Sequence, residues 1–205
     1  MPTTAPPRSS RNKRELQRTV RRDAILAAAR KVFARKGFDG STIADIAGEA
    51  GVAAGTVYLY YASKIDLFAA LNVQLFRGII EAMEETDAPP ELRGGTHARI
   101  HAVFQAAERE SDLLRLIFLN PDPRTEVARR LRHADEERLR PIASILRTGM
   151  EASNVRGGDP MFLARLINGL VLTALYQCFV QSDGHDAGAF EETITDMIVG
   201  ALTPS

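Results

Sequence analysis

The stretch that decides the fold is AGVAAGTVYLYYASK, residues 50–64. It holds two glycines, three tyrosines and a single charged residue, although the segments on both sides have helical periodicity. Gly51 favours a tight turn, because glycine adopts a left-handed backbone at little cost. The helical spacing of apolar residues restarts at Ala54. The stretch therefore predicts a turn followed by a short helix that ends near residue 60 or 61.

Two more helices are expected before this turn. Apolar residues recur at spacings of three and four over residues 21–36, and Gly37 ends that pattern. Thr42 and Asp45 then have the spacing of a capping box, in which the threonine accepts from the aspartate amide and the carboxylate reaches back. A short helix is expected to begin here and to end at Gly51.

This order of helices is that of a helix-turn-helix motif. The major groove of DNA admits one α-helix, and the preceding helix must brace it, so the turn between them has to be small. Ser63 and Asp66 repeat the capping arrangement after the motif. They predict a longer helix over residues 63–85.

The third helix offers neutral groups that suit contact with DNA. Gly55 lets the backbone approach closely, and Thr56 carries both a hydroxyl and a methyl group. Tyr58 and Tyr60 can each donate to a phosphate oxygen, although tyrosines at these positions could also be core residues. Two neighbours are expected in the core: Val57 and Tyr61.

Charge is unevenly distributed although the chain is formally neutral. Residues 1–70 hold 12 Lys and Arg and 6 Asp and Glu, whereas the remainder holds 14 and 20. Halves of opposite sign suggest two functions on one chain. The basic residues are densest in residues 1–20, where Pro, Ser and Thr also gather, and this segment is expected to be a flexible basic arm. The alternative is a solvated tail that binds nothing.

A continuous, ungapped pattern over residues 21–70 carries a resemblance. Its positions are Phe33, Gly37, Thr42, Ile46-Ala47, Ala50-Gly51-Val52, Gly55-Thr56, Tyr58, Tyr60-Tyr61, Ser63-Lys64 and Leu67. The pattern resembles the N-terminal signature of the tetracycline-repressor (TetR) family of bacterial transcriptional regulators. The rest of the chain shows only compatible length and helicity.

The resemblance implies an all-α fold with two domains. A three-helix helix-turn-helix DNA-binding domain is expected over residues 21–68, and a helical ligand-binding and dimerisation domain over residues 69–205. The resemblance also implies a homodimer whose recognition helices enter the major groove of a palindromic operator. A small molecule bound in the second domain would change the separation of the two recognition helices.

The resemblance also assigns site residues by position. Thr42 and Lys64 match positions that contact phosphate. One position departs from the pattern, because Ala53 stands where the family often has a capping serine. A lost cap costs about 1 kcal/mol in general. The recognition surface is assigned to five residues: Ala54, Gly55, Thr56, Tyr58 and Tyr60.

The remainder of the chain has the pattern of a helical bundle. Helices are expected over residues 96–108, 112–119, 123–151, 160–181 and 187–202, separated by proline and glycine breakers. The helix over residues 160–181 is apolar nearly all round, but Arg165, Asn168 and Gln177 interrupt it, which favours a buried helix over a membrane span. A helix of this kind needs cover on more than one side.

A second copy of the chain can supply that cover. We expect a homodimer through the last two helices, and the alternative is a fully internal helix in a larger monomer. The residues of the last helix expected at this interface are Phe190, Ile194, Met197, Ile198 and Ala201.

Apolar residues of the middle helices are candidates for an effector pocket. Such a lining predicts an apolar or amphipathic ligand with few polar anchors, although ordinary core is the preferred interpretation for each residue taken singly. The candidates are Phe76, Ile80, Met83, Ile100, Phe104, Ile117, Phe118, Ile142, Leu146, Thr173, Tyr176 and Gln177.

Other chemistry has weaker signals. His97 and His101 could share a helix face and hold a metal, but a convincing third ligand is lacking, so surface or partly buried histidines are expected instead. Cys178 lies in an apolar segment and is expected to be an inert buried thiol. The sequence has no phosphate-binding glycine loop with lysine, no HExxH and no GxSxG, and it predicts no enzyme activity, cofactor or metal. The N-terminus lacks an apolar signal segment, so the expected compartment is the cytoplasm.

Three hypotheses follow. The first is a repressor that binds a palindromic operator as a dimer and is released by a small effector. The second is a dimeric DNA-binding architectural or partner-recruiting factor without a small-molecule switch. The third is a helical enzyme or carrier whose short helices only mimic the motif, and it predicts no operator binding.

Overall fold

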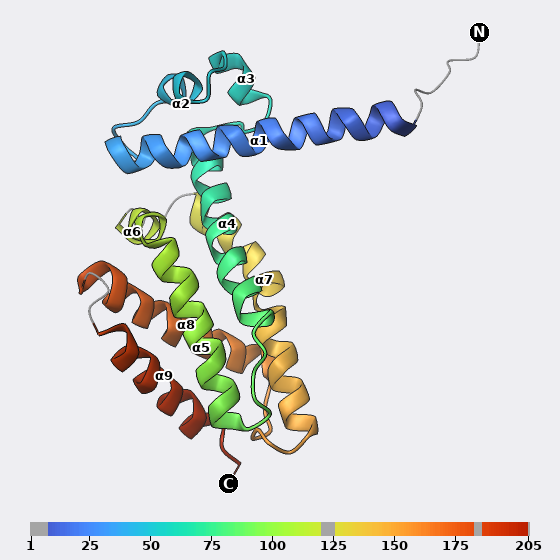
Figure 1. Cartoon of the computed structure of the whole chain (residues 1–205), viewed down its shortest axis with the longest axis vertical. Helices are drawn as coiled ribbons and strands as arrows, with labels where there is room; N and C mark the ends of the chain where they lie inside the picture. Colours follow the sequence, from blue (N-terminus) through green and yellow to red (C-terminus); the bar gives the residue numbers. More distant parts are fainter. Residues whose placement is uncertain (1–7, 120–125, 183–185, 205) are drawn as a thin grey trace. The chain divides into compact units, whose positions relative to one another are not determined.

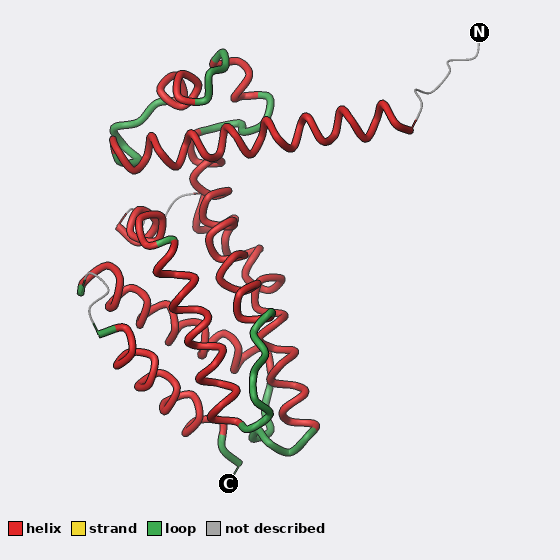
Figure 2. Tube along the Cα trace, viewed as in Figure 1, coloured by secondary structure: helices red, strands yellow, loops and turns green. Residues whose placement is uncertain are grey.

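The computed structural model describes residues 8–119, 126–182 and 186–204, and within these the side chains of residues 8–14 and 126–138 are not described. All regular secondary structure in these ranges is helical (Figures 1 and 2). The all-α fold expected from the sequence is confirmed. The chain forms two compact units, with the first ending at Leu71 and the second beginning at Asn72.

The first unit contains three helices and the start of a fourth. Helix α2 packs against both α1 and α3, and α2 and α3 lie on the same side of α1 (Figure 1). The helices are α1 (Arg8–Lys36), α2 (Ile43–Glu49), α3 (Ala54–Tyr58) and α4 (Lys64–Glu84), the last of which continues into the second unit.

Helix α1 begins earlier than the sequence pattern predicts. It starts at Arg8, so the part of the expected flexible arm from Arg8 to residue 20 is helical, and residues 1–7 lie outside the described residues. Residues 15–24 are exposed, which explains why no apolar periodicity marks this part of the helix. Arg, Lys, Leu, Glu and Gln are good helix formers, and no Gly or Pro follows Pro7 in this segment.

Local signals set the other helix ends in this unit. Gly37 and Gly51 have φ values of 70° and 66°, so both predicted glycine turns are confirmed. The Thr42 hydroxyl accepts from the Asp45 amide at 3.1 Å, and the Asp45 carboxylate accepts from the Thr42 amide at 3.0 Å. The capping box predicted from this pair is therefore confirmed.

The core of the first unit is built around three phenylalanines. Phe33 of α1 lies 5.6 Å from Phe38 and 6.0 Å from Phe68 between ring centroids, and Phe38 lies 5.0 Å from Phe68. Ile46 of α2 and Val57 of α3 are fully buried. The short helices are thus held by burial of one apolar face each.

The second unit is a bundle of the remaining helices. A helix is expected over residues 96–108, but α5 already begins after Glu91, which is its N-cap residue. Pro123, the expected start of the long helix, lies outside the described residues. The helices are α5 (Leu92–Arg109), α6 (Ser111–Leu119), α7 (Glu126–Glu151), α8 (Pro160–Tyr176), η1 (Gln177–Gln181) and α9 (Ala187–Leu202).

The expected single helix over residues 160–181 is divided in two. Asp159 caps its start by accepting from the Met161 amide at 2.9 Å, but after Tyr176 the backbone widens into the π-helix η1. Arg115 of α6 donates through Nε to the Phe179 carbonyl at 2.8 Å. A tertiary contact of this kind cannot be read from local sequence, so the division was not predictable.

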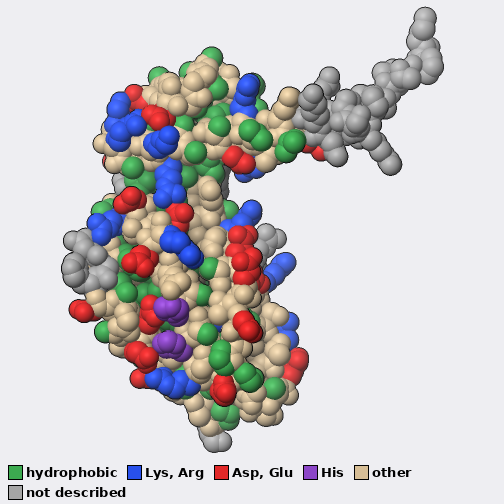
Figure 3. Space-filling model, in the orientation of Figure 1, with side chains coloured by type: hydrophobic (Ala, Val, Ile, Leu, Met, Phe, Trp, Pro, Cys, Tyr) green, Lys and Arg blue, Asp and Glu red, His purple; other side chains and the backbone are tan. Residues whose placement is uncertain are grey.

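Charged side chains join α5 to α9 on the surface shown in Figure 3. Arg93 pairs with Glu192 at 2.9 Å and also with Asp196, and His97 lies 3.2 Å from Glu192. His101 lies 2.8 Å from Glu191 and stacks on the other histidine, with ring centroids 6.4 Å apart. The side chains of His97 and His101 are 41% and 50% exposed, as expected for surface or partly buried histidines. Over the described residues, no group of three or more His, Cys, Asp or Glu side chains could hold a metal ion.

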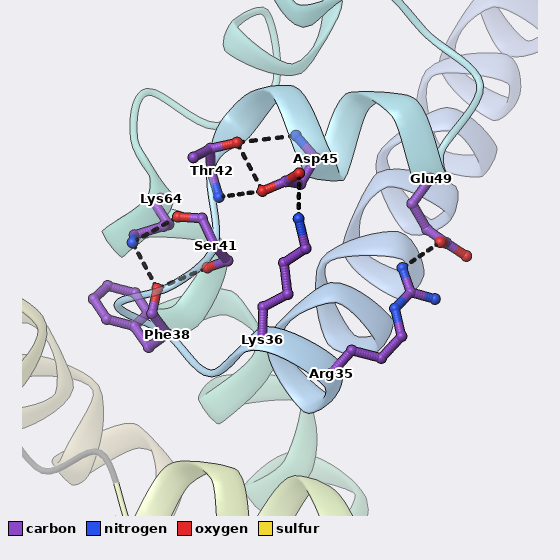
Figure 4. Close-up of polar contacts among 8 residues, drawn as sticks. All are labelled: Arg35, Lys36, Phe38, Ser41, Thr42, Asp45, Glu49 and Lys64. Carbon is purple, nitrogen blue, oxygen red and sulfur yellow. Dashed lines mark hydrogen bonds and ion pairs between the residues drawn. The ribbon is translucent and has the colours of Figure 1, made fainter.

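Lys64 ties the start of α4 to the turn between α1 and α2 (Figure 4). Its ammonium donates to the carbonyls of Phe38 at 2.6 Å, Ser41 at 2.9 Å and Asp39 at 3.4 Å. The same nitrogen lies 4.5 Å from the centroid of the Phe38 ring. One cation thus satisfies carbonyls that the sharp turn leaves without helical partners.

We expect Phe33→Ala to destabilise the protein by roughly 3–5 kcal/mol, because it opens a cavity between two other aromatic rings. Urea unfolding followed by circular dichroism measures the change. Leu16→Ala is the matched control on the same helix, since Leu16 is 65% exposed. The aromatic core would be unimportant if both variants unfolded at the wild-type urea concentration.

We expect Lys64→Met to lower the free energy of unfolding by about 1.5 kcal/mol, because it keeps the aliphatic stem but removes a charged donor from three carbonyls. The same unfolding experiment measures it. Lys31→Met is the control, since the Lys31 side chain is largely exposed and its ion pair with Glu49 is long, at 3.6 Å. Equal stability of the two variants would contradict the role given to Lys64.

Candidate functional site

Helix α3 presents an exposed surface on a buried brace. Val57 is fully buried and Tyr61 is 5% exposed, as expected for core residues. The opposite side is open, with Tyr58 55% and Leu59 74% exposed. A β-carbon on Gly55 would meet nothing within 4 Å, so this part of the helix is accessible to a large partner.

The tyrosines predicted to contact DNA differ in their placement. Tyr58 is on the helix, and the Tyr58 hydroxyl has no hydrogen-bond partner among the described residues. Tyr60 is half-buried and lies beyond the helix end, because α3 stops at Tyr58 rather than at residue 60 or 61. Ala54 is exposed and Thr56 is half-buried. Ala53 is the N-cap residue of α3 and makes no side-chain capping hydrogen bond, because alanine has no polar side-chain atom.

The two residues matched to phosphate-contacting positions are both engaged within the protein. Thr42 donates its hydroxyl proton to Asp45 at 2.9 Å while capping α2. Lys64 directs its ammonium to the carbonyls of the turn at residues 38–41. In this structure both side chains hold the helices in place.

Ion pairs brace α2 against the end of α1 (Figure 4). Arg35 contacts Glu49 at 2.7 Å and Lys36 contacts Asp45 at 2.6 Å. The hydrogen bond from Lys36 lowers the pKa of Asp45, and the hydrogen bond from Arg35 lowers the pKa of Glu49. Arg35 and Lys36 at the end of α1 therefore pair with carboxylates of α2, and these pairs help to orient the helix that supports α3.

The second unit contains a cavity of about 490 Å³, a volume within the range of small-molecule sites. Its walls come from the loop over residues 88–91, the start of α5, the end of α7 with the loop after it, one residue each of α4 and α8, and two residues of α9. The loop is part of the segment between α4 and α5 in Figure 2. Most lining side chains are apolar.

A narrow cavity of about 60 Å³ shares lining residues with the first. It lies among α4, α5, α7 and α8 and is lined by apolar side chains, with Arg99 and Asn168 as the polar ones. The residues common to both cavities are Met83, Arg99, Ile100, Ile142 and Ile167.

Half of the pocket residues expected from sequence line these cavities. Met83, Ile100, Ile142 and Leu146 line the larger one, and Phe76 and Ile80 line the narrow one. Met83 is also 7% exposed, so it closes the cavity from the α4 side.

At the other end of the bundle, some of the expected pocket residues pack against neighbouring aromatic side chains. Phe104 lies 6.0 Å from Phe179, and Phe118 lies 5.5 Å from Tyr176. Helical periodicity identifies an apolar face but not which of its residues meet a neighbour and which border a cavity. Six expected residues line neither cavity: Phe104, Ile117, Phe118, Thr173, Tyr176 and Gln177. Of these, Thr173 and Gln177 are exposed.

Arg99 is a lining residue that sequence reasoning missed. It follows Gly95 by one turn of α5 and donates through Nη1 to the Gly95 carbonyl at 3.0 Å. A β-carbon on Gly95 would lie 2.5 Å from the Pro89 carbonyl oxygen, so glycine allows the loop to close over α5. The Pro89-Pro90 and Gly94-Gly95 pairs were the signals for this close approach.

An apolar surface remains on the last helices. Phe162 and Leu166 of α8 and Met197 of α9 are 57%, 55% and 53% exposed. Two expected interface residues, Ile194 and Ile198, are instead buried in the protein's own core, since they lie on the opposite face of α9.

The segment Pro160–Gln181 is apolar and long enough to cross a membrane by those two criteria alone, which a core helix of a folded protein also meets. Ala164, Ala174 and Leu175 on this helix are buried within the second unit. Cys178 is buried in η1 as expected, and burial raises the pKa of its thiol.

Comparison with known proteins gives consistent matches. Residues 25–71 match the family model for bacterial regulatory proteins of the tetR family. The HTH-type transcriptional activator FasR of Mycolicibacterium smegmatis is 31% identical over 119 residues, which are 56% of this chain and 53% of FasR. The chain thus spans about half the length of that relative. The fatty acid metabolism regulator protein of Bacillus subtilis is 24% identical over 182 residues, covering 87% of this chain and 93% of that protein.

A solved structure extends the likeness of fold to nearly the whole chain. The transcriptional regulator FadR of Bacillus subtilis, in complex with stearoyl-CoA, superposes with a TM-score of 0.69 at 21% identity. The match covers 87% of this chain and 97% of FadR. Residues 25–71, which hold the helix-turn-helix geometry described above, therefore match the tetR family of bacterial regulatory proteins, and the fold of most of the chain is similar to that of FadR.

Proposed function

We propose that the protein is a transcriptional repressor that binds a palindromic operator as a homodimer and is released by a small apolar or amphipathic effector. The observation that carries the proposal is the exposed surface of α3 on its buried brace. A regulator of this kind acts on chromosomal DNA, so we place it in the cytoplasm.

The DNA-reading surface consists of neutral groups. Tyr58 presents a hydroxyl that has no hydrogen-bond partner in the described part of the chain, and Gly55 leaves room for close approach of the backbone. Thr56 and Tyr60 flank them, and Ala54 is exposed at the start of the helix. Thr42 and Lys64 support this surface from within, and a phosphate would have to compete with their internal partners.

The homodimer is supported by the exposed apolar surface of α8 and α9. Phe162 and Leu166 lie four residues apart and share one face of α8. A two-fold axis brings the same patch of both chains together, which buries these side chains. Two recognition helices held in this way would read half-sites about 34–36 Å apart or at a multiple of that distance.

The cavity in the second unit favours an effector-controlled regulator over a switchless DNA-binding factor. Its apolar walls suit an aliphatic ligand. One relative is named a fatty acid metabolism regulator, and a structural neighbour holds stearoyl-CoA. We therefore propose a long-chain acyl compound as the effector class.

Coupling between effector and operator requires a different affinity of the effector for the DNA-binding and released states. Helix α4 supplies Lys64 to the first unit and Met83 to the cavity of the second, so it is the element we assign to this coupling. Release of operator by the effector defines a repressor of this kind. Tighter operator binding with the effector would instead agree with an activator, the function named for FasR.

We propose a DNA-binding domain over residues 21–68 and an effector and dimerisation domain over residues 69–205. The basic residues that precede residue 21 would strengthen operator binding by neutralising phosphates of the DNA backbone. Helix α1 carries that segment from Arg8 onward.

We expect Tyr58→Phe to weaken operator binding by roughly tenfold or more, because a hydrogen bond to a charged phosphate is lost. Fluorescence anisotropy with a fragment of the protein's own promoter region measures the affinity. Tyr176→Phe is the matched control, since its hydroxyl accepts from Gln181 in the second unit at 2.7 Å. Equal affinity of both variants and the wild type would remove Tyr58 from the reading surface.

We expect Leu166→Asp to convert the dimer to a monomer, because the charge would be buried in an apolar interface. Light scattering coupled to size-exclusion chromatography distinguishes one chain from two. Leu119→Asp is the control, since Leu119 is 62% exposed on α6. A monomeric wild type, or a dimeric Leu166→Asp protein, would contradict the proposed interface.

A further inference from the structure

The larger cavity contains a cation in otherwise apolar surroundings. Arg99 of α5 borders both cavities, at the place where they share lining residues. Around it lie apolar side chains of three other helices, Met83 of α4, Ile142 of α7 and Ile167 of α8. Arg99 therefore lies where the larger cavity and the narrow cavity meet.

The guanidinium of Arg99 is poorly compensated by the protein. One nitrogen donates to the Gly95 carbonyl on the same helix, and no carboxylate of the described residues forms an ion pair with Arg99. A guanidinium has five N–H donors, so most of its donor capacity is unused by described groups. Burial lowers the pKa of Arg99 below its ordinary value, although the side chain remains charged at neutral pH.

A half-buried cation without a counter-ion is costly, and an anion entering the cavity would offset that cost. Glu91 is the acidic residue among those lining the larger cavity, but it is exposed on the loop at the N-cap of α5. The other polar lining groups of the larger cavity are neutral: Thr96, Ser144, Thr148 and Asn154. The cavity thus combines apolar walls with one charged anchor.

We propose that Arg99 binds the anionic group of an aliphatic effector, so that the pocket selects anionic amphiphiles over neutral ones of the same chain length. The aliphatic chain lies along the apolar walls of α4, α7 and α8. The anion can be a carboxylate or a phosphate, since the planar fork of arginine binds both. This inference rests on the proposed effector pocket and adds the residue and the charge that determine its selectivity.

The test compares dodecanoate, dodecyl phosphate and dodecanol, which share a chain and differ in the head group. Isothermal titration calorimetry of the full chain, below the micelle concentrations, gives each affinity. We expect Arg99→Gln to weaken binding of an anion by roughly 10- to 100-fold and to leave dodecanol within about twofold of the wild type. Retained dodecanol binding shows that the variant is folded and its cavity intact.

Two further variants sharpen the comparison. Arg99→Lys keeps the charge but not the two-pronged geometry, so its affinity for anions should fall between those of the wild type and Arg99→Gln. Arg93→Gln removes an arginine from the same helix that pairs with Glu192 outside both cavities, and it should bind all three probes as the wild type does.

The affinities of the wild type for the two anionic probes show which head group is preferred. If Arg99→Gln weakens binding of one anion alone, Arg99 binds that head group. Unchanged affinity of Arg99→Gln for both anions would overturn the inference, as would a wild type that binds none of the probes. Operator release is measured separately by anisotropy. If the wild type binds anions selectively but does not release operator DNA, the proposed regulation is contradicted and the assignment of Arg99 still holds.

Discussion

The structure of the first unit depends on the fact that its two central helices are too short to be stable alone. Helix α2 has seven residues and α3 has five, whereas isolated helices in water need about 12–15. Their stability must come from tertiary contacts. Buried Ile46 and Val57, the ion pairs of Arg35 and Lys36, and the contacts of Lys64 with the turn at residues 38–41 supply these contacts.

This constraint explains why the candidate DNA-reading surface carries so little charge. Cations that would otherwise face a partner are used inside the unit, where they hold carboxylates of α2 or carbonyls of the turn. The exposed part of α3 keeps neutral groups, with the hydroxyl of Tyr58 and the open backbone at Gly55. Neutral groups can read base edges and phosphates once the helix is held in a fixed orientation.

Sequence reasoning was most successful where the signal is local. Helix ends at Gly37, Gly51 and Thr42 were predictable, because φ freedom and capping bonds involve residues within a few positions. Local signals do not show which residues of an apolar face meet a neighbouring helix. Half of the expected pocket residues line a cavity, whereas Phe104 and Phe118 pack against aromatic partners on η1 and α8. The early start of α1 at Arg8 was missed because an exposed helix leaves no apolar period.

The sequence by itself determined the all-α class, the helix-turn-helix order and the face of α3 that is buried, since each follows from spacing and caps over a few residues. Only the tertiary structure decided the roles of Lys64 and Arg99. Lys64 bonds to carbonyls 23 to 26 positions earlier in the chain, and Arg99 borders a cavity whose walls come from five helices. A side chain's chemistry is written in the sequence, but its partners depend on which distant segments folding brings beside it.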